Sequence, residues 1–164
     1  MDTPSLDGIH HLKVHAIDVR RSARWYASTL GYEPLMEFVE GSRLVGYGLS
    51  HPHGGTLLTL RLDPEQAAKT AGSVYFEMGV PHTGALTELA LRLDDPGVPH
   101  GPVVRTPIGW LLSGVFDPDG HEMRFYVSEP QELVDPRHPI RIHDAGPEGW
   151  SERIESIDLS DPPA

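Results

Sequence analysis

Apolar and polar residues alternate from Gly8 to Ala16, and the alternation places one set of side chains on each face of an extended chain. This period is typical of a strand with one buried face. Asp18 follows at a position suited to a helix N-cap, and apolar side chains then recur at helical spacing. The pattern predicts a helix over Val19–Leu30 that Gly31 ends.

Three strands account for the rest of the first half. Their alternating or continuous apolar residues lie over Tyr32–Val39, Arg43–Leu49 and Thr56–Leu62, with glycine-containing turns between them. The first half is therefore a βαβββ unit, module one, over residues 8–62. Residues 63–72 predict a linker that carries one helical turn.

The second half repeats this order as module two, residues 73–128. A strand is predicted at Ser73–Val80 and a helix at about Thr83–Leu93. Three more strands are predicted at Val103–Pro107, Trp110–Phe116 and His121–Ser128. Asp117-Pro-Asp-Gly120 joins the last two strands, and its proline and glycine suit a tight turn.

The two halves also match residue by residue. His11 aligns with Tyr75, and the residues after each open a strand and then a helix. Gly55–Leu62 aligns with Gly120–Val127, a glycine turn followed by a closing strand. Two matched βαβββ units predict a duplicated module and an α+β fold.

Residues 1–7 form a polar leader, and the composition changes again after Ser128. Residues 129–164 hold nine acidic residues against three arginines and are rich in proline, which predicts an irregular acidic tail. Trp150, Ile154 and Ile157 lie at helical spacing. They indicate either one short docked helix or incidental apolar residues, and the sequence leaves both open.

Length, charge and cysteine content limit the classes of function that the chain can have. The chain has 164 residues, enough for one domain or for two small modules that share a core. A net charge of -11 argues against binding to nucleic acid or to an anionic membrane surface. Without cysteine there is no disulfide, thiolate nucleophile or cysteine-bound metal. We expect a cytoplasmic protein, because no secretory leader or membrane-spanning apolar run is present.

Several dispersed motifs resemble the vicinal oxygen chelate superfamily, which includes glyoxalase I, extradiol dioxygenases, fosfomycin-resistance enzymes and bleomycin-resistance proteins. The motifs are His11-Leu12 before Asp18, Ser22 and Tyr26 ahead of Leu30-Gly31, and Asp-Pro-Asp-Gly before the final strand. The resemblance covers about residues 8–128. It implies that the two modules curl into an open barrel with a small-molecule ligand on the concave side, and it suggests a homodimer.

The same resemblance assigns the metal-ligand positions of the superfamily to His11, Thr59, Tyr75 and Arg124. Only His11 is a good ligand, and Arg124 carries a fixed positive charge that repels a cation. We therefore expect no metal or other cofactor. A rebuilt metal site from His11, His15, Glu77 or Glu122 is a weaker alternative.

Alternation predicts a set of side chains that face the implied cavity. In this set Arg124 or Lys13 would bind an anionic or carbonyl group, and His11 and Glu77 are the candidate catalytic residues for proton transfer. The remaining predicted ligand contacts are His15, Thr59, Arg61, Tyr75, Trp110, Glu122 and Tyr126. The alternative is structural: Glu77 neutralises Arg124 or Lys13, and the network only satisfies buried polarity.

The leading hypothesis is a metal-independent small-molecule-binding protein that sequesters an antibiotic or metabolite. A metal-free lyase, isomerase or cyclase is the second hypothesis, and a metal-dependent glyoxalase or dioxygenase is the third. No nucleophile elbow, phosphate-binding loop or dinucleotide fingerprint occurs in the sequence, which disfavours covalent catalysis and nucleotide cofactors.

Overall fold

A computed structural model describes residues 8–128, 139–143 and 149–157. The chain divides into two units. Unit one holds the chain up to Tyr75 together with Phe116–Glu122, and unit two holds Phe76–Val115 and the chain from Met123 onward. Both units contain a four-stranded sheet and a twelve-residue helix.

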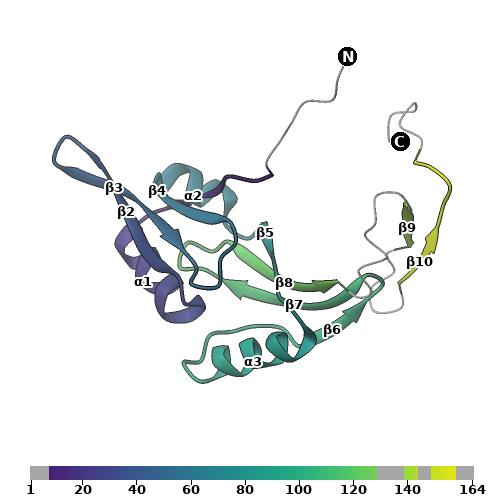
Figure 1. Cartoon of the computed structure of the whole chain (residues 1–164). Helices are drawn as coiled ribbons and strands as arrows, with labels where there is room; N and C mark the ends of the chain where they lie inside the picture. Colours follow the sequence, from purple (N-terminus) through teal and green to yellow (C-terminus); the bar gives the residue numbers. More distant parts are fainter. Residues whose placement is uncertain (1–7, 129–138, 144–148, 158–164) are drawn as a thin grey trace, which may run out of the picture. The chain divides into compact units, whose positions relative to one another are not determined.

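The first sheet follows the predicted order of elements (Figure 1). Its elements and the helix that follows them are β1 His11–Ala16, α1 Val19–Leu30, β2 Glu33–Glu40, β3 Arg43–Ser50, β4 Leu57–Leu62 and α2 Pro64–Thr70. The strands lie in the order β1-β4-β3-β2, with β1 parallel to β4 and the other neighbours antiparallel. The predicted helical turn in the linker is the seven-residue helix α2, which starts at Pro64 after the N-cap Asp63.

The second sheet repeats this topology. Its elements are β5 Val74–Gly79, α3 Thr83–Asp94, β6 Val103–Thr106, β7 Gly109–Phe116 and β8 Glu122–Ser128. The order β5-β8-β7-β6 places the first strand beside the last, as in the first sheet. The shared strand order confirms the duplicated βαβββ arrangement and the α+β class.

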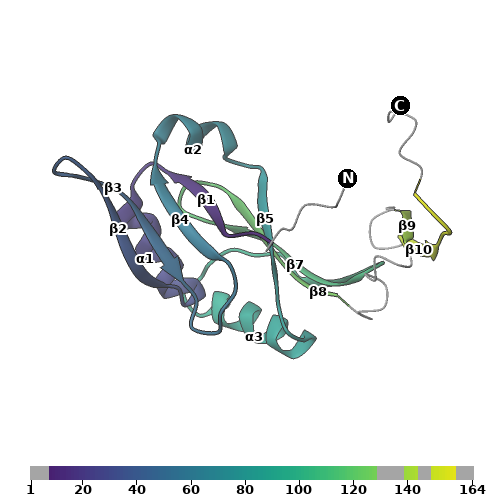
Figure 2. The ribbon, with the colours of Figure 1, turned by 45° about the horizontal axis from the view of Figure 1, so that its top comes forward.

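Helix α1 has the bounds that its capping residues predict. The Asp18 side chain accepts hydrogen bonds from the backbone N–H groups of Arg20 and Arg21, at 2.9 and 3.0 Å. Gly31 ends the helix in the left-handed conformation, with φ of 80°. The helix packs on one face of the first sheet (Figure 2), where its buried side chains include Ala23 and Tyr26. The core of unit one also includes Val14, Ala16, Val45, Leu49, Leu58 and Leu60.

The loop Asp117–His121 anchors α1 through its carboxylates. Asp119 accepts hydrogen bonds from the Ile17 N–H at 2.9 Å, the Ser22 hydroxyl at 2.5 Å and the Arg21 guanidinium at 3.0 Å. Asp117 accepts one from the buried Tyr26 hydroxyl at 3.0 Å. The turn itself is as predicted, but these long-range contacts are not evident from the sequence. They explain why this loop belongs to unit one.

The tail departs from the prediction. Ile140–His143 and Trp150–Arg153 form the antiparallel strands β9 and β10, so the helical interpretation of Trp150 is wrong. Trp150 stacks on His143 of the partner strand, with ring centroids 3.8 Å apart and planes 13° apart. A cross-strand aromatic pair of this kind favours a hairpin over a helix. The other tail residues, 129–138, 144–148 and 158–164, lie outside the described part, as does the predicted leader 1–7.

Candidate functional sites on the two sheets

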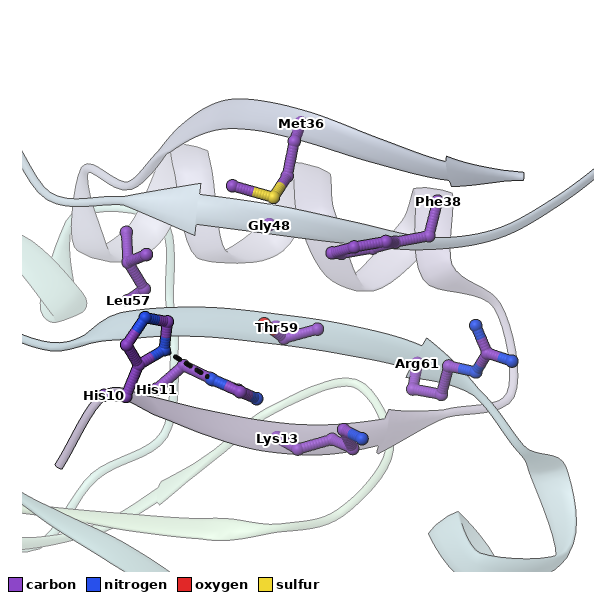
Figure 3. Close-up of a pocket in the computed structure, with 9 residues that line it drawn as sticks. All are labelled: His10, His11, Lys13, Met36, Phe38, Gly48, Leu57, Thr59 and Arg61. Atoms are coloured by element: carbon purple, nitrogen blue, oxygen red, sulfur yellow. Dashed lines mark hydrogen bonds between the residues drawn. The ribbon is translucent and has the colours of Figure 1, made fainter. Parts of the chain in front are cut away.

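The first sheet carries a cavity of about 280 Å³ on the face that α1 does not cover (Figure 3). Its lining combines basic, polar and apolar side chains from four strands and the residue before β1: His10, His11, Lys13, Met36, Phe38, Gly48, Leu57, Thr59 and Arg61. Four predicted site residues therefore lie together here. They are His11 and Lys13 of β1, and Thr59 and Arg61 of β4.

Two glycines of β3 create the apolar wall of this cavity. A Cβ atom at Gly48 would lie 2.5 Å from Cγ of Met36, and one at Gly46 would lie 3.2 Å from the Phe38 ring. Met36 and Phe38 can therefore lie across β3 from the edge strand β2 (Figure 3). Sequence reasoning missed this wall. Its signal is the Gly-x-Gly spacing at inward positions of a strand, which leaves room for side chains of the neighbouring strand.

His10 also lines this cavity. Its Nδ1 is 3.0 Å from Nδ1 of His11, and the two rings meet edge to face. One of the two nitrogens must accept, so the hydrogen bond requires at least one neutral imidazole. Strand alternation alone would place His10 on the face opposite His11, but β1 begins only at His11, so the alternation does not extend to His10.

The second sheet carries a larger cavity, of about 490 Å³. Three predicted site residues line it: Glu77, Arg124 and Tyr126. The other lining residues are mostly apolar: Val104, Arg105, Thr106, Pro107, Ile108, Leu111 and Ile142. The Arg124 guanidinium is 4.0 Å from the Glu77 carboxylate, and these side chains are 35% and 49% exposed. The Tyr126 hydroxyl hydrogen-bonds to the hydroxyl of Thr106.

The remaining predicted site residues line neither cavity. His15 and Tyr75 contact each other instead, with the phenol oxygen 3.2 Å from Nδ1 of His15. Burial and, less strongly, the negative charge of Asp117 raise the pKa of the Tyr75 phenol. The hydroxyl therefore stays protonated at neutral pH and can donate to His15.

Trp110 and Glu122 also lie apart from the two cavities. Arg105 lies over the Trp110 ring, 5.7 Å from its centroid, and the neighbouring Leu111 lines the cavity of the second sheet. Trp110, which was predicted to stack on a flat ligand, does not line this cavity, whereas the next residue of β7 does. Leu111 was not among the predicted site residues.

The residues at the superfamily's metal positions do not fit a divalent cation. His11 and Thr59 share their cavity with Lys13 and Arg61, and Arg124 brings a third fixed positive charge to the other cavity. Three histidine or carboxylate ligands are the usual minimum for a catalytic site. Among residues 8–128, 139–143 and 149–157, no group of three or more histidines, aspartates and glutamates is placed to hold a metal ion.

A family model of the Glyoxalase/Bleomycin resistance protein/Dioxygenase superfamily matches residues 8–125. The chain belongs to this superfamily. The match covers the first sheet and the second sheet as far as Phe125 in β8, and it includes every predicted site residue except Tyr126. A comparison with curated protein sequences gives no significant match.

Solved structures of other superfamily members have the same fold. A glyoxylase/bleomycin resistance protein/dioxygenase domain from Frankia sp. EAN1pec has a TM-score of 0.62 at 22% identity, covering 76% of this chain and all of that one. TnmS3, an antibiotic-binding protein from Streptomyces sp. CB03234, has a TM-score of 0.63 at 17% identity, covering 77% and 100%. The fosfomycin resistance protein FosX from Listeria monocytogenes has 0.60 at 12%, covering 78% and 98%.

These identities are low, so the likeness shows the fold and leaves the activity to be argued from the residues. Within the described ranges, no helix is long and apolar enough to cross a membrane.

Proposed function

We propose that this superfamily member binds a small organic molecule without a metal ion, and that the ligand lies in the cavity of the second sheet. The observation that carries the proposal is the placement of Arg124. Its guanidinium lies in a cavity with mostly apolar walls, 4.0 Å from the Glu77 carboxylate, and the side chain remains about a third exposed. A cation in this setting can orient an anionic or carbonyl oxygen while the apolar walls bind the rest of the ligand.

The apolar walls and the polar groups of this cavity have different roles in ligand binding. Val104, Ile108 and Leu111 provide apolar contact, and the hydroxyls of Thr106 and Tyr126 provide hydrogen bonds. Arg124 replaces the metal's positive charge, because a guanidinium can donate two parallel hydrogen bonds to a carboxylate, enolate or phenolate. The sequestration of an antibiotic or metabolite requires no more than such a cavity.

A metal-free lyase or isomerase with His11 and Glu77 as acid and base is the second candidate function. His11 lines the cavity of the first sheet and Glu77 lines that of the second. For such a reaction, the general acid and the general base must both come within hydrogen-bond reach of one substrate. Product formation from any bound compound, measured by mass spectrometry, would favour the enzyme over the binding protein.

The test starts with a thermal-shift screen that covers antibiotics, aromatic diols and 2-oxo aldehydes. For the compound that shifts the melting temperature most, Arg124→Ala is expected to weaken binding by about 10- to 100-fold. The free energy of unfolding should fall by less than about 1 kcal/mol, because the Glu77 carboxylate is 49% exposed and stays hydrated without its partner.

The matched control is Arg24→Ala, which removes an exposed arginine of α1 that lines neither cavity. Its ligand affinity should equal that of the unaltered protein. Normal binding by a folded Arg124→Ala protein would contradict the anchoring role.

Metal independence is tested separately: a chelator should leave ligand affinity unchanged, and elemental analysis should find no stoichiometric metal. Light scattering tests the expected homodimer against the chain mass of 18.1 kDa.

A further inference from the structure

The C-terminal hairpin contributes to the cavity of the second sheet, although it lies outside the part of the chain that the superfamily model matches. That match ends at residue 125, and the strands β9 and β10 come after it. Ile142 of β9 nevertheless lines the cavity together with Pro107 and Ile108 of the turn between β6 and β7. The hairpin therefore adds a wall to the proposed ligand site that the matched domain does not supply.

The hairpin has an inner and an outer face. Ser151 pairs with Ile142 across the two strands, and directly opposed residues point to the same face. The Ser151 hydroxyl donates to the Pro107 carbonyl at 3.5 Å, at the turn where Ile142 lines the cavity. Ile142 and Ser151 thus form the inner face. The next pair, Trp150 and His143, alternates to the outer face.

The contacts of the outer face hold the two strands of the hairpin together. The Trp150 ring stacks on the His143 ring with 3.8 Å between their centroids. The Glu152 carboxylate lies 3.1 Å from Nε2 of His143 and 3.6 Å from the Arg141 guanidinium. All of these partners belong to the hairpin itself. They stabilise its folded form without attaching it to the second sheet.

The attachment of the hairpin to the body of unit two is weak. The strands β9 and β10 form a two-stranded sheet of their own, and such a hairpin alone is only marginally stable in water. The hydrogen bond to Pro107 is long and therefore weak. Ile142 is still 42% exposed, so a ligand in the cavity can bury more of its apolar surface. The hairpin can therefore open at small cost and is favoured in its closed position by a bound ligand.

We propose that the hairpin β9–β10 is a lid that opens and closes the cavity of the second sheet, with Ile142 and Ser151 on its closing face. The lid, the cavity and the sheet all belong to unit two. The identity of what the lid admits rests on the function proposed above. Because the closing face presents an isoleucine, the part of the ligand beneath it is apolar, while Arg124 binds the anionic or carbonyl oxygen.

The experiment uses a single introduced thiol, because the chain has no cysteine, and it needs no ligand. Leu111→Cys places the thiol on the wall of the cavity, and mass spectrometry follows its alkylation by N-phenylmaleimide. Adding Trp150→Ala should raise the alkylation rate by about 2- to 10-fold, the factor that corresponds to the loss of one aromatic pair. This change is compatible with folding, because Trp150 is 51% exposed and lies outside both four-stranded sheets.

Three further variants serve as controls. Trp150→Tyr keeps an aromatic ring against His143 and should return the rate to that of Leu111→Cys alone. Ile157→Ala removes another exposed apolar side chain of the tail, one that lines neither cavity, and should leave the rate unchanged. Val115→Cys places a thiol at a fully buried position of β7, where alkylation requires the sheet itself to open. Its rate should not respond to Trp150→Ala.

Two results would overturn the lid. The first is an alkylation rate of Leu111→Cys that does not change with Trp150→Ala. The second is an equal increase at Val115→Cys, which would show that the whole sheet has loosened. Failure of the proposed function is seen in a different measurement: normal ligand binding by Arg124→Ala would contradict the anchoring role and leave the alkylation rates as they are.

Discussion

Asp117 is the most heavily hydrogen-bonded carboxylate of the loop that anchors α1. One oxygen accepts from the backbone N–H groups of Asp119 and His121, at 2.9 and 3.0 Å. The other lies 3.0 Å from both the Tyr26 hydroxyl and Nδ1 of His121. Burial, the largest influence, raises the pKa of Asp117, but these bonds, led by those of His121, outweigh it and lower the pKa below 3.8. The folded state therefore favours the ionised carboxylate.

This shift predicts a specific acid sensitivity. A carboxylate with a lowered pKa in the folded state contributes stability that is fully present above its unfolded value, near pH 4, and is lost as the pH falls through the folded pKa. Asp117→Asn should lower the free energy of unfolding by about 3 kcal/mol at pH 7, because it removes a buried charge and replaces one acceptor oxygen with an amide nitrogen that cannot accept a hydrogen bond. It should also reduce the dependence of stability on pH between 5 and 2. Urea unfolding at several pH values measures both effects.

The control for this prediction is Asp95→Asn, at the exposed C-cap of α3. Its acid dependence should match that of the unaltered protein. An Asp117→Asn protein with an undiminished slope below pH 5 would show that other carboxylates carry the acid sensitivity.

Helix α1 depends on the left-handed conformation of Gly31 at its end. The Gly31 N–H donates to the Ala27 carbonyl at 3.1 Å, and φ is 80°. A Cβ atom there would lie 3.7 Å from His51 Nε2, an ordinary contact, so the cost of Gly31→Ala comes from the backbone. We expect a loss of about 1 to 2 kcal/mol in the free energy of unfolding, measured by urea denaturation.

Gly79→Ala provides the comparison. Gly79 ends β5, does not have positive φ, and has no neighbouring atom within 4 Å of an added Cβ. Its effect should stay within about 0.5 kcal/mol. Similar costs at both positions would mean that the loss at Gly31 is a general effect of losing glycine.

Elements with local signals were predictable from the sequence, and those defined by distant partners were not. Asp18 and Gly31 fix both ends of α1 through hydrogen bonds to residues within one turn. Trp150 and Ile154 have helical spacing, yet Trp150 pairs with His143, which is close only after the hairpin forms. The Met36 wall likewise depends on the absence of a side chain at Gly48 in another strand.

Strand alternation selected His11, Lys13, Arg124 and Glu77 as candidate site residues, and each of them lines one of the two cavities. Alternation defines the face of the sheet on which a side chain lies but not its neighbours, so it did not predict which residues share a cavity. The proline and glycine of Asp117–Gly120 predicted the turn, but the sequence did not predict the contacts of the Asp117 and Asp119 carboxylates, because their partners in α1 lie more than ninety residues away in the chain.

The two units are interleaved in the chain, and this predicts how a fragment behaves. Residues 1–75 alone lack Phe116–Glu122, so the buried side chains of Ser22 and Tyr26 lose their Asp119 and Asp117 partners. Each buried polar group without a hydrogen-bond partner lowers the free energy of unfolding by about 1 to 3 kcal/mol, and a typical domain has only about 5 to 15 kcal/mol. We expect the fragment to give a poorly dispersed NMR spectrum and no cooperative melt.

The matched fragment joins residues 1–75 through a glycine-serine linker to residues 116–122. It should recover dispersed amide signals, and Asp119→Ala in this fragment should remove them again. A cooperative melt of residues 1–75 without the added loop would show that unit one does not depend on it.

The position of the anchoring loop in the chain predicts when unit one can finish folding during translation. Unit one opens at the N-terminus, but Phe116–Glu122 are translated only after α3, β6 and most of β7. At a translation rate of about 5 to 20 residues per second, the Ser22 and Tyr26 side chains of nascent α1 lack these partners for several seconds. The N-terminal unit can therefore be completed only after Phe76–Val115 of unit two have been synthesised.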